Sequence, residues 1–175
     1  MITLRQMAVA FLFHENQMLF MQKANNNSFV SGMVIPIGGH LEQHEISMPK
    51  EACLREIVEE TGLTNDDLSD LNLKYIVLRI KDNEIRIQYV YFGDVKHTNV
   101  VDSEEGRLFW VNCEETGTLN VTATTKYILE HYSNTSKGSS DVFIGTMKSN
   151  DSQPEITWAL LEDWELTSSS LIMHK

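Results

Sequence analysis

The chain has 175 residues, a formal net charge of −11 and a hydrophobic fraction of 42%. This size and composition are typical of one globular domain with a substantial core, so we expect a single domain over residues 1–175. The negative charge argues against a nucleic-acid polymer as partner, because such polymers bind to basic patches. It does not exclude a small nucleotide, because a bound cation reverses the local charge.

Cysteine content and hydropathy limit the cellular context. The two cysteines, Cys53 and Cys113, are too few for a disulfide framework, and the sequence shows no secretory signal. No apolar run approaches the length of a membrane span. We therefore expect a reduced, cytoplasmic protein that does not associate with a membrane.

The first part of the chain predicts a hairpin followed by a short strand. Apolar runs over 7–13 and 18–22 fit two paired strands, and residues 14–17 form the turn between them. A polar loop over 23–28 precedes another short strand at 32–37. This strand leads into Gly38-Gly39, a pair that permits a tight turn and a close approach of the backbone to a ligand.

A helix of about three turns is predicted between Pro49 and Gly62. Proline fits the first helical turn, where its missing N–H has no cost, and glycine fits the left-handed position that ends a helix. One side carries, at helical spacing, Leu54, Ile57, Val58 and Thr61. The opposite side carries Glu56, Glu59 and Glu60.

Three carboxylates this close repel one another, which leaves two interpretations of the helix. A plain amphipathic helix keeps such a face in water. A functional helix uses it to share a divalent cation such as Mg²⁺, which takes oxygen ligands and commonly binds substrate phosphates as well. The glycine pair and the short acidic loop before the helix favour the second interpretation.

Two antiparallel strands are predicted after the helix, over 73–80 and 84–95, with a turn at 81–83. Side chains alternate along the second strand, so that one face carries Ile85, Ile87, Tyr89 and Tyr91 and the other Arg86, Gln88, Val90 and Phe92. One face is expected to meet the core and the other to floor a pocket. Arg79 and Arg86 are candidate phosphate or base contacts, although exposed arginines are common on strands.

The remaining chain predicts an acidic loop at 102–106, a strand at 108–111 and a second helix at 122–131. A flexible link at 133–140 leads to a hairpin of strands 142–147 and 155–161. That hairpin either extends the sheet or forms a dimer interface. This order of elements predicts a mixed α/β fold with a largely antiparallel sheet.

The stretch from Gly38 to Leu63 resembles the signature of the Nudix hydrolase family, G-x5-E-x7-R-E-U-x-E-E-x-G-U, where U is a bulky apolar residue. The matching positions are Gly39, Glu45, Arg55, Glu56, Ile57, Glu59, Glu60, Gly62 and Leu63. Nine residues, rather than seven, separate Glu45 from Arg55. We interpret the difference as a two-residue insertion around 46–48, which leaves either Glu42 or Glu45 to contact Arg55.

The resemblance implies a Nudix-type α/β/α sandwich, with a core over about 3–132 and a C-terminal hairpin extension over about 141–165. It implies Mg²⁺ as cofactor, with Mn²⁺ as a substitute. The metal ligands would be the Gly38 carbonyl, Glu56, Glu59 and Glu60, with Glu105 as an additional ligand or as the base that activates water. Glu104 is the second choice for that role, and Arg55 would orient the glutamates. The implied catalytic residues are thus Glu59, Glu60, Glu56, Arg55 and Glu105.

The family cleaves nucleoside diphosphates linked to another group, and the layout of this chain looks most like its mutator-type (MutT-like) branch. That branch hydrolyses nucleoside triphosphates, including oxidised ones such as 8-oxo-dGTP, to the monophosphate and pyrophosphate. ADP-ribose or another nucleoside-diphosphate compound is the alternative substrate. A non-catalytic Nudix-like nucleotide sensor is the alternative to an enzyme. By analogy with the family, a homodimer is a further expectation.

Overall fold

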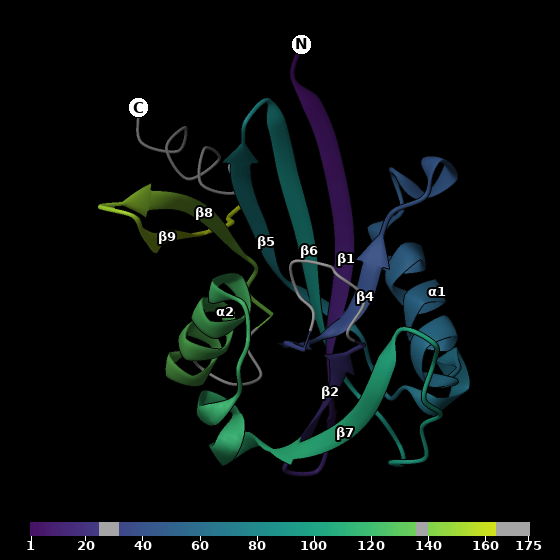
Figure 1. Ribbon diagram of the computed structural model, residues 1–175. Coiled ribbons are helices and arrows are strands. Elements are labelled where there is room, and N and C mark those ends of the chain that lie inside the picture. The colour runs from purple at the N-terminus through teal and green to yellow at the C-terminus, as the bar shows by residue number, and fades with distance from the viewer. Residues whose placement is uncertain (25–31, 136–139, 164–175) are drawn as a thin grey trace, which may run out of the picture.

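The computed structural model describes residues 1–24, 32–135 and 140–163. Within these residues, the strands form one mixed sheet, and an α-helix lies on each side of it (Figure 1). The helices are α1 (Pro49–Thr61) and α2 (Ala123–Asn134), and short 3₁₀ turns span Gln43–Glu45, Asn65–Asp67 and Cys113–Thr118. The strands are β1 (Thr3–His14), β2 (Gln17–Lys23), β3 (Val34–Ile35), β4 (Ile37–His40), β5 (Asn72–Lys81), β6 (Glu84–Asp94), β7 (Gly106–Asn112), β8 (Phe143–Asn150) and β9 (Gln153–Leu160). The predicted α/β class is confirmed.

Strand β1 organises the sheet, whose order is β3-β2-β1-β6-β5-β8-β9. It runs parallel to β6 over its whole length. Its other edge is shared by two antiparallel partners, with β4 along Met7–Ala10 and β2 along Leu12–His14. Strand β7 pairs with β2. This arrangement brings β4, and the start of β7, to the same side of β1.

The glycine pair lies within β4 and not in a turn, so the predicted turn is wrong. Gly38 lies opposite Val9 and Gly39 opposite Ala8 in the ladder with β1. The strand expected over 32–37 is instead two short strands, β3 and β4, which Pro36 separates. Proline lacks the N–H that a continuous ladder requires.

Alternating side chains of β1 build a separate core on each face of the sheet. Ala8, Ala10 and Leu12 pack on the α1 side, against Ala52, Cys53, Ile57 and Leu63 among others. Val9 and Phe11 pack on the α2 side, against Ile128, Val90 and Phe92. Both faces of β6 therefore contact core where β1 pairs with its second half, and Phe92, on the α2 side, also lines a pocket at the end of the strand. Each large side chain buried in this way stabilises the fold by about 1.5–3 kcal/mol.

Helix α1 begins and ends as predicted, but its buried face is different. Pro49 is its first residue, and Gly62 ends it with φ 74° and an N–H bonded to the Val58 carbonyl. Ile57 is buried, whereas Val58 is 46% exposed. Glu56 and Glu60 are buried against β4 and not solvated on the far side of the helix. The two glycines of β4 leave the space that these carboxylates fill.

The C-terminal hairpin extends the sheet. Strand β8 runs parallel to β5 from Tyr75↔Phe143 to Arg79↔Met147, and β9 forms the new edge. Its turn is tighter than the predicted one, with positive φ at Asp151 and Ser152. Helix α2 extends past the predicted end at residue 131. Much of the predicted loop 23–28, part of the link 133–140 and the end of the extension 141–165 lie outside the described residues. None of the described helices is long and apolar enough to cross a membrane.

Candidate active site

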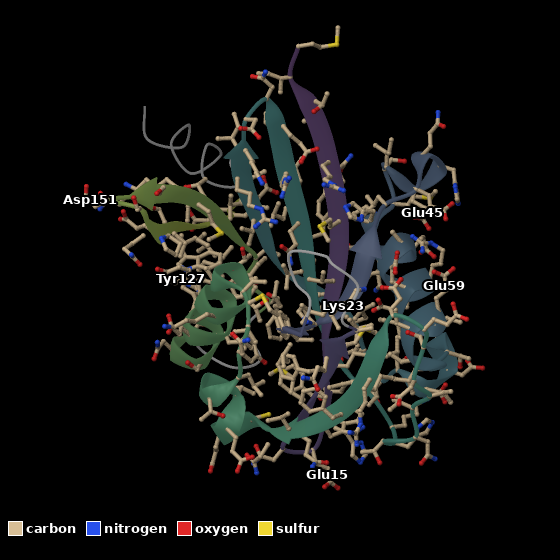
Figure 2. The ribbon with its side chains drawn as sticks, viewed as in Figure 1. Glu15, Lys23, Glu45, Glu59, Tyr127 and Asp151 are labelled. Atoms are coloured by element: carbon tan, nitrogen blue, oxygen red, sulfur yellow. The ribbon has the colours of Figure 1, made fainter. Side chains whose placement is uncertain are left out.

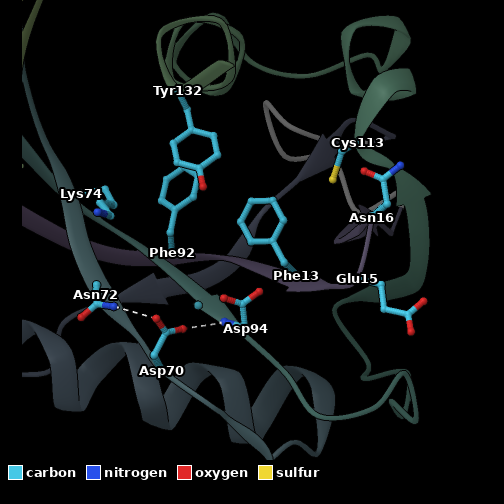
Figure 3. A pocket seen from close by; sticks show the side chains of 11 residues that line it. Phe13, Glu15, Asn16, Asp70, Asn72, Lys74, Phe92, Asp94, Cys113 and Tyr132 are labelled. Carbon is cyan, nitrogen blue, oxygen red and sulfur yellow. Dashed lines mark hydrogen bonds between the residues drawn. The ribbon is translucent and has the colours of Figure 1, made fainter. Parts of the chain in front are cut away.

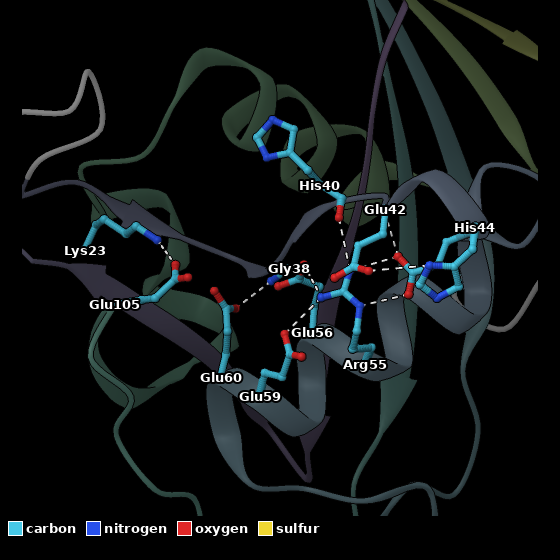
Figure 4. Close-up of polar contacts among 11 residues, drawn as sticks. Lys23, Gly38, His40, Glu42, His44, Arg55, Glu56, Glu59, Glu60 and Glu105 are labelled. Carbon is cyan, nitrogen blue, oxygen red and sulfur yellow. Dashed lines mark hydrogen bonds and ion pairs between the residues drawn. The ribbon is translucent and has the colours of Figure 1, made fainter.

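Arg55 is the centre of the polar contacts on α1 (Figure 4). Its Nε and Nη2 donate to the two carboxylate oxygens of Glu45 at 2.8 and 2.9 Å. Its Nη1 donates to Glu56 at 2.8 Å and to Glu59 at 2.9 Å, and Nη2 also reaches the His40 carbonyl at 3.1 Å. One guanidinium therefore holds three carboxylates, and its hydrogen bond to Glu45 is the largest cause that raises the Arg55 pKa.

The structure decides which acidic residue of the loop contacts the helix arginine. Glu45 does so and is buried, and its Oε2 also accepts the Glu42 N–H at 2.9 Å. The Arg55 hydrogen bonds are the main cause that lowers the Glu45 pKa to about 2. Glu42 instead lies 3.5 Å from His44. The inserted stretch remains outside this contact, because Ile46 and Met48 project into solvent. The insertion lengthens the loop without breaking the pair.

The glycines of β4 bring backbone against the carboxylates of α1. The Gly38 N–H donates to Glu60 Oε2 at 2.7 Å. A Cβ at Gly39 would lie 2.5 Å from Glu56 Oε1, and one at Gly38 would lie 2.2 Å from the Ala8 carbonyl oxygen. Gly38 also has φ 139°, which side chains rarely allow. Both positions therefore require glycine if the two glutamates are to pack here.

Burial leaves negative charge at this site without full compensation. Desolvation raises the pKa of Glu60 to about 8, against the Gly38 hydrogen bond that lowers it. Desolvation also raises the pKa of Glu56, against the opposing effect of Arg55. Nearby carboxylates, Glu105 among them, add to both shifts. A cation bound between these groups would lower both pKa values and stabilise the ionised forms.

Glu105 approaches the same site from β7. It directly precedes the strand, forms an ion pair with Lys23 at the end of β2, and faces Glu60 (Figure 4). Lys23 is the main cause that lowers the Glu105 pKa. For the role of additional ligand or base, Glu105 was the first choice from the sequence and Glu104 the second. Glu104 is exposed. Lys23 was missed, because the sequence placed it in a loop and gave no sign that β2 pairs with β7.

The donor set fits a hard divalent cation in its chemistry. Glu56, Glu59, Glu60, Glu105 and the Gly38 carbonyl offer only oxygen ligands, as Mg²⁺ prefers. Across residues 1–24, 32–135 and 140–163, however, no three His, Cys, Asp or Glu side chains are already arranged as a metal site. Arg55 holds Glu56 and Glu59, of which the Glu59 side chain is 57% exposed. Figure 2 shows Glu45 and Glu59 together on the α1 side of the molecule.

A pocket of about 320 Å³ lies elsewhere, around the C-terminal ends of β1 and β6 (Figure 3). None of the predicted site residues lines it. Its walls include Phe13, Phe92, Tyr132, Asp70, Asp94 and Cys113. The residues that line this pocket do not overlap with those of the carboxylate site, so the two are separate features.

Comparison with known proteins agrees with this geometry. The model of the NUDIX domain family matches residues 3–134. The fold is similar to the mutator protein MutT from Bacillus halodurans, with TM-score 0.67, 22% identity and coverage of 89% of this chain and 97% of that one. A MutT protein from Methanosarcina mazei Go1 gives TM-score 0.65 and 21% identity, covering 76% of this chain and 95% of that one.

A third similar structure is an Ap4A hydrolase from C. elegans in a binary complex, with TM-score 0.56, 15% identity and coverage of 76% of this chain and 96% of that one. No curated protein sequence matches the chain. The fold, the Arg55-centred carboxylates and the match over residues 3–134 together show that the chain belongs to the NUDIX family of hydrolases. Hydrolysis of pyrophosphate linkages in nucleotides is the chemistry of that class.

Proposed function

We propose that the protein hydrolyses a nucleoside diphosphate-linked substrate with Mg²⁺ at the carboxylates of α1, and that Mn²⁺ can replace Mg²⁺. The observation that carries this proposal is the burial of Glu56 and Glu60 against Gly38 and Gly39. Burying carboxylates is costly unless another charge compensates for it. Arg55 compensates in part, and a divalent cation supplies the remainder.

Each site residue has a role that follows from its contacts. Glu56, Glu59 and Glu60, together with the Gly38 carbonyl, would hold the cation. When bound, Mg²⁺ supplies charge neutralisation at phosphate oxygens and activation of water. Arg55 positions the glutamates by holding Glu56 and Glu59 from one side. Lys23 lowers the Glu105 pKa, so this carboxylate stays ionised and is a weaker base. This favours Glu105 as an additional metal ligand and not as the base.

We propose a nucleoside triphosphate as substrate, an oxidised one such as 8-oxo-dGTP included, with monophosphate and pyrophosphate as products. The similarity in fold to MutT proteins from two organisms supports this choice. ADP-ribose and other nucleoside-diphosphate compounds remain the alternative, and the fold similarity to an Ap4A hydrolase makes dinucleoside tetraphosphates part of that group. We further propose one domain over residues 1–175, a cytoplasmic location, no polymer or membrane partner, and a homodimer as the assembly to test.

The test is product analysis with a nucleotide panel. The pure protein would be incubated with Mg²⁺ and the ordinary triphosphates, 8-oxo-dGTP, ADP-ribose and a dinucleoside tetraphosphate. Monophosphate plus pyrophosphate from a triphosphate, abolished by EDTA and restored by Mg²⁺ or Mn²⁺, is the expected result. Cleavage of ADP-ribose alone would be consistent with the proposed metal site but would contradict the proposal of a triphosphate substrate. Tight binding of one compound without turnover of any would reject the enzyme in favour of a sensor.

A further inference from the structure

Three arginines form a row across the sheet on the α2 face. Arg5 of β1 pairs directly with Arg86 of β6, and Arg86 pairs directly with Arg79 of β5. Each arginine lies an even number of residues from Val9, Val90 or Val77 on its own strand, so it is on the same face of the sheet. Those valines belong to the core on the α2 side. We refer to Arg5, Arg86 and Arg79 as the arginine row. The chain has only 14 basic residues against 25 acidic ones, so this local excess of positive charge is unexpected.

The row is not neutralised by the protein. Like charges directly opposite one another in a sheet are destabilising. Glu84 is the one carboxylate that contacts the row within the described residues, at 2.6 Å from Arg86 and 3.8 Å from Arg5. Arg79 has no carboxylate partner in the described chain, and its hydrogen bond to Thr124 Oγ1 is long, at 3.5 Å. Burial lowers its pKa most, and the nearby charges of Arg86 and Arg5 lower it further against an opposing effect of Glu84.

The row remains accessible at the end of the sheet. Side-chain exposure is 45% for Arg5 and 26% for Arg86. Figure 1 shows that, among the described elements, no helix lies over the ends of β1, β5 and β6 nearest the N-terminus. Arg79 also contacts Thr124 in the first turn of α2, a helix start that favours an anion although the Thr122 side chain already caps the Thr125 N–H. A phosphate group suits such a place, because the guanidinium groups can each donate two hydrogen bonds to it. The N-terminus of α2 and the partial burial of the arginines strengthen this interaction.

A hydrogen bond connects the row to the active site. Arg5 Nε donates to His40 Nε2 at 2.7 Å, and the His40 carbonyl accepts from Arg55. Burial and the Arg5 charge lower the His40 pKa, as fits an imidazole that accepts this bond. From β4 across β1 and β6 to β5 there are three strand spacings, about 14 Å in all. A diphosphate at the α1 carboxylates therefore leaves much of this span to the rest of a substrate.

We propose that the arginine row is a second phosphate subsite, and that the substrates it selects carry a phosphate group besides the diphosphate that is cleaved. This inference rests on the proposed function for its place in catalysis, but not for the binding of phosphate. The added phosphate has two possible sources, a substituent on the ribose 3′ position or a longer 5′ polyphosphate chain. Both present anionic phosphate oxygens to Arg79 and Arg86, from a phosphate monoester in the first case and from further phosphates of the chain in the second.

Binding is measured first, by titration calorimetry without metal. The probes are adenosine 3′,5′-bisphosphate and adenosine 5′-monophosphate, with a dinucleoside tetraphosphate as the long-chain arm. Arg79→Gln should weaken binding of at least one of the more highly phosphorylated probes about tenfold, as loss of a charged hydrogen bond predicts, and should leave the monophosphate unaffected. Arg79→Lys should restore part of the affinity because it restores the charge. The matched control is Lys126→Gln, which removes one exposed charge from α2.

The outcomes separate the two proposals. An effect on the bisphosphate assigns the 3′ source, and an effect on the tetraphosphate alone assigns the longer chain; either supports the subsite. Equal affinity of wild type and Arg79→Gln for every probe overturns it. Thermal unfolding checks the fold, and Arg86→Gln repeats the test if Arg79→Gln fails to fold. If the panel with Mg²⁺ yields no turnover, the proposed hydrolysis fails, while these binding data still decide the subsite. If turnover occurs, Arg79→Gln should raise KM for the selected substrate with kcat nearly unchanged.

Discussion

Two charged clusters lie on either side of the β4–β1 ladder, and their charges are unbalanced in opposite directions. On α1, Arg55 faces the carboxylates of Glu45, Glu56 and Glu59, with Glu60 close by. On the α2 face of the sheet, the arginine row contacts the carboxylate of Glu84, the one carboxylate that reaches it among the described residues. His40 connects the two clusters through a side-chain contact to Arg5 and a backbone contact to Arg55.

The difference indicates what each cluster is for. A cluster that served only stability would pair its charges, because unpaired buried charge is costly. On our proposals, a cation would complete the carboxylate cluster and an anion the arginine row. A nucleotide complexed with Mg²⁺ would offer both charges to the two clusters. Each variant below removes one charge from one of the clusters or, at Arg55, keeps the charge and removes the fork that pairs with it.

The largest effect is expected from Glu60→Gln and Glu59→Gln. Both should fold normally and lose most activity, by about a thousandfold in kcat, because loss of a metal ligand removes several kcal/mol of transition-state stabilisation. Steady-state kinetics with Mg²⁺ on the substrate found in the panel measures this effect. The matched control is Glu51→Gln, which alters an exposed glutamate in the first turn of α1. Retained activity in both site variants would show that these glutamates do not hold the metal.

Arg55→Lys should lower stability as well as activity. Lysine keeps the charge but loses the fork that reaches Glu45, Glu56 and Glu59, and leaves buried Glu45 without its bidentate partner. We expect a loss of about 3 kcal/mol, at the low end for a broken buried pair because Arg55 is partly exposed. For a chain of this size that is a fall in Tm of roughly 6–12 °C. A Tm equal to that of the wild type would mean that Glu45 and Arg55 do not depend on each other.

The features that the sequence predicted correctly are those that depend on residues close together in the chain. The helix limits at Pro49 and Gly62, the three hairpins and the glutamates of α1 follow from local spacing, and all were predicted. The burial of Glu56 and Glu60 was not predicted, because helical periodicity cannot show that the opposing strand carries two glycines. The number of residues in the loop left both Glu42 and Glu45 as partners of Arg55, because spacing alone cannot show that the insertion projects outward and that Glu45 reaches the arginine.

The charges that depend on strand pairing were beyond the sequence. Lys23 reaches Glu105 only because β2 pairs with β7, whose residues are about 80 positions later in the chain. Arg79 and Arg86 were recognised as candidate phosphate contacts, but Arg5 was not. Its place in the row depends on a parallel pairing of β1 with β6, and no local pattern reports the register of two distant parallel strands.

Acid should weaken the carboxylate cluster through Glu45. Its folded pKa of about 2 lies below the ordinary 4.5, so its ionised form stabilises the fold above pH 4.5, and this contribution is lost as the pH falls towards 2. The wild-type Tm should therefore decrease across this window. Glu45→Gln should lower Tm at neutral pH and show a shallower decrease in acid. The control is Glu130→Gln on the exposed side of α2, and an unchanged acid slope in Glu45→Gln would assign the effect to other groups.

The smallest effect on stability, and the sharpest test of the comparison, is expected from Glu84→Gln. Glu84 is partly exposed and contacts arginines at the surface, so its removal should cost less than about 1 kcal/mol of stability. It also removes a carboxylate that offsets the arginine row, so affinity for the more highly phosphorylated probe should rise severalfold and become more dependent on salt. Calorimetry at two ionic strengths measures both changes. If Glu84 instead served to fix the arginines in place, the same variant would bind the probe more weakly, and the row would be a structural ion pair and not a site for phosphate.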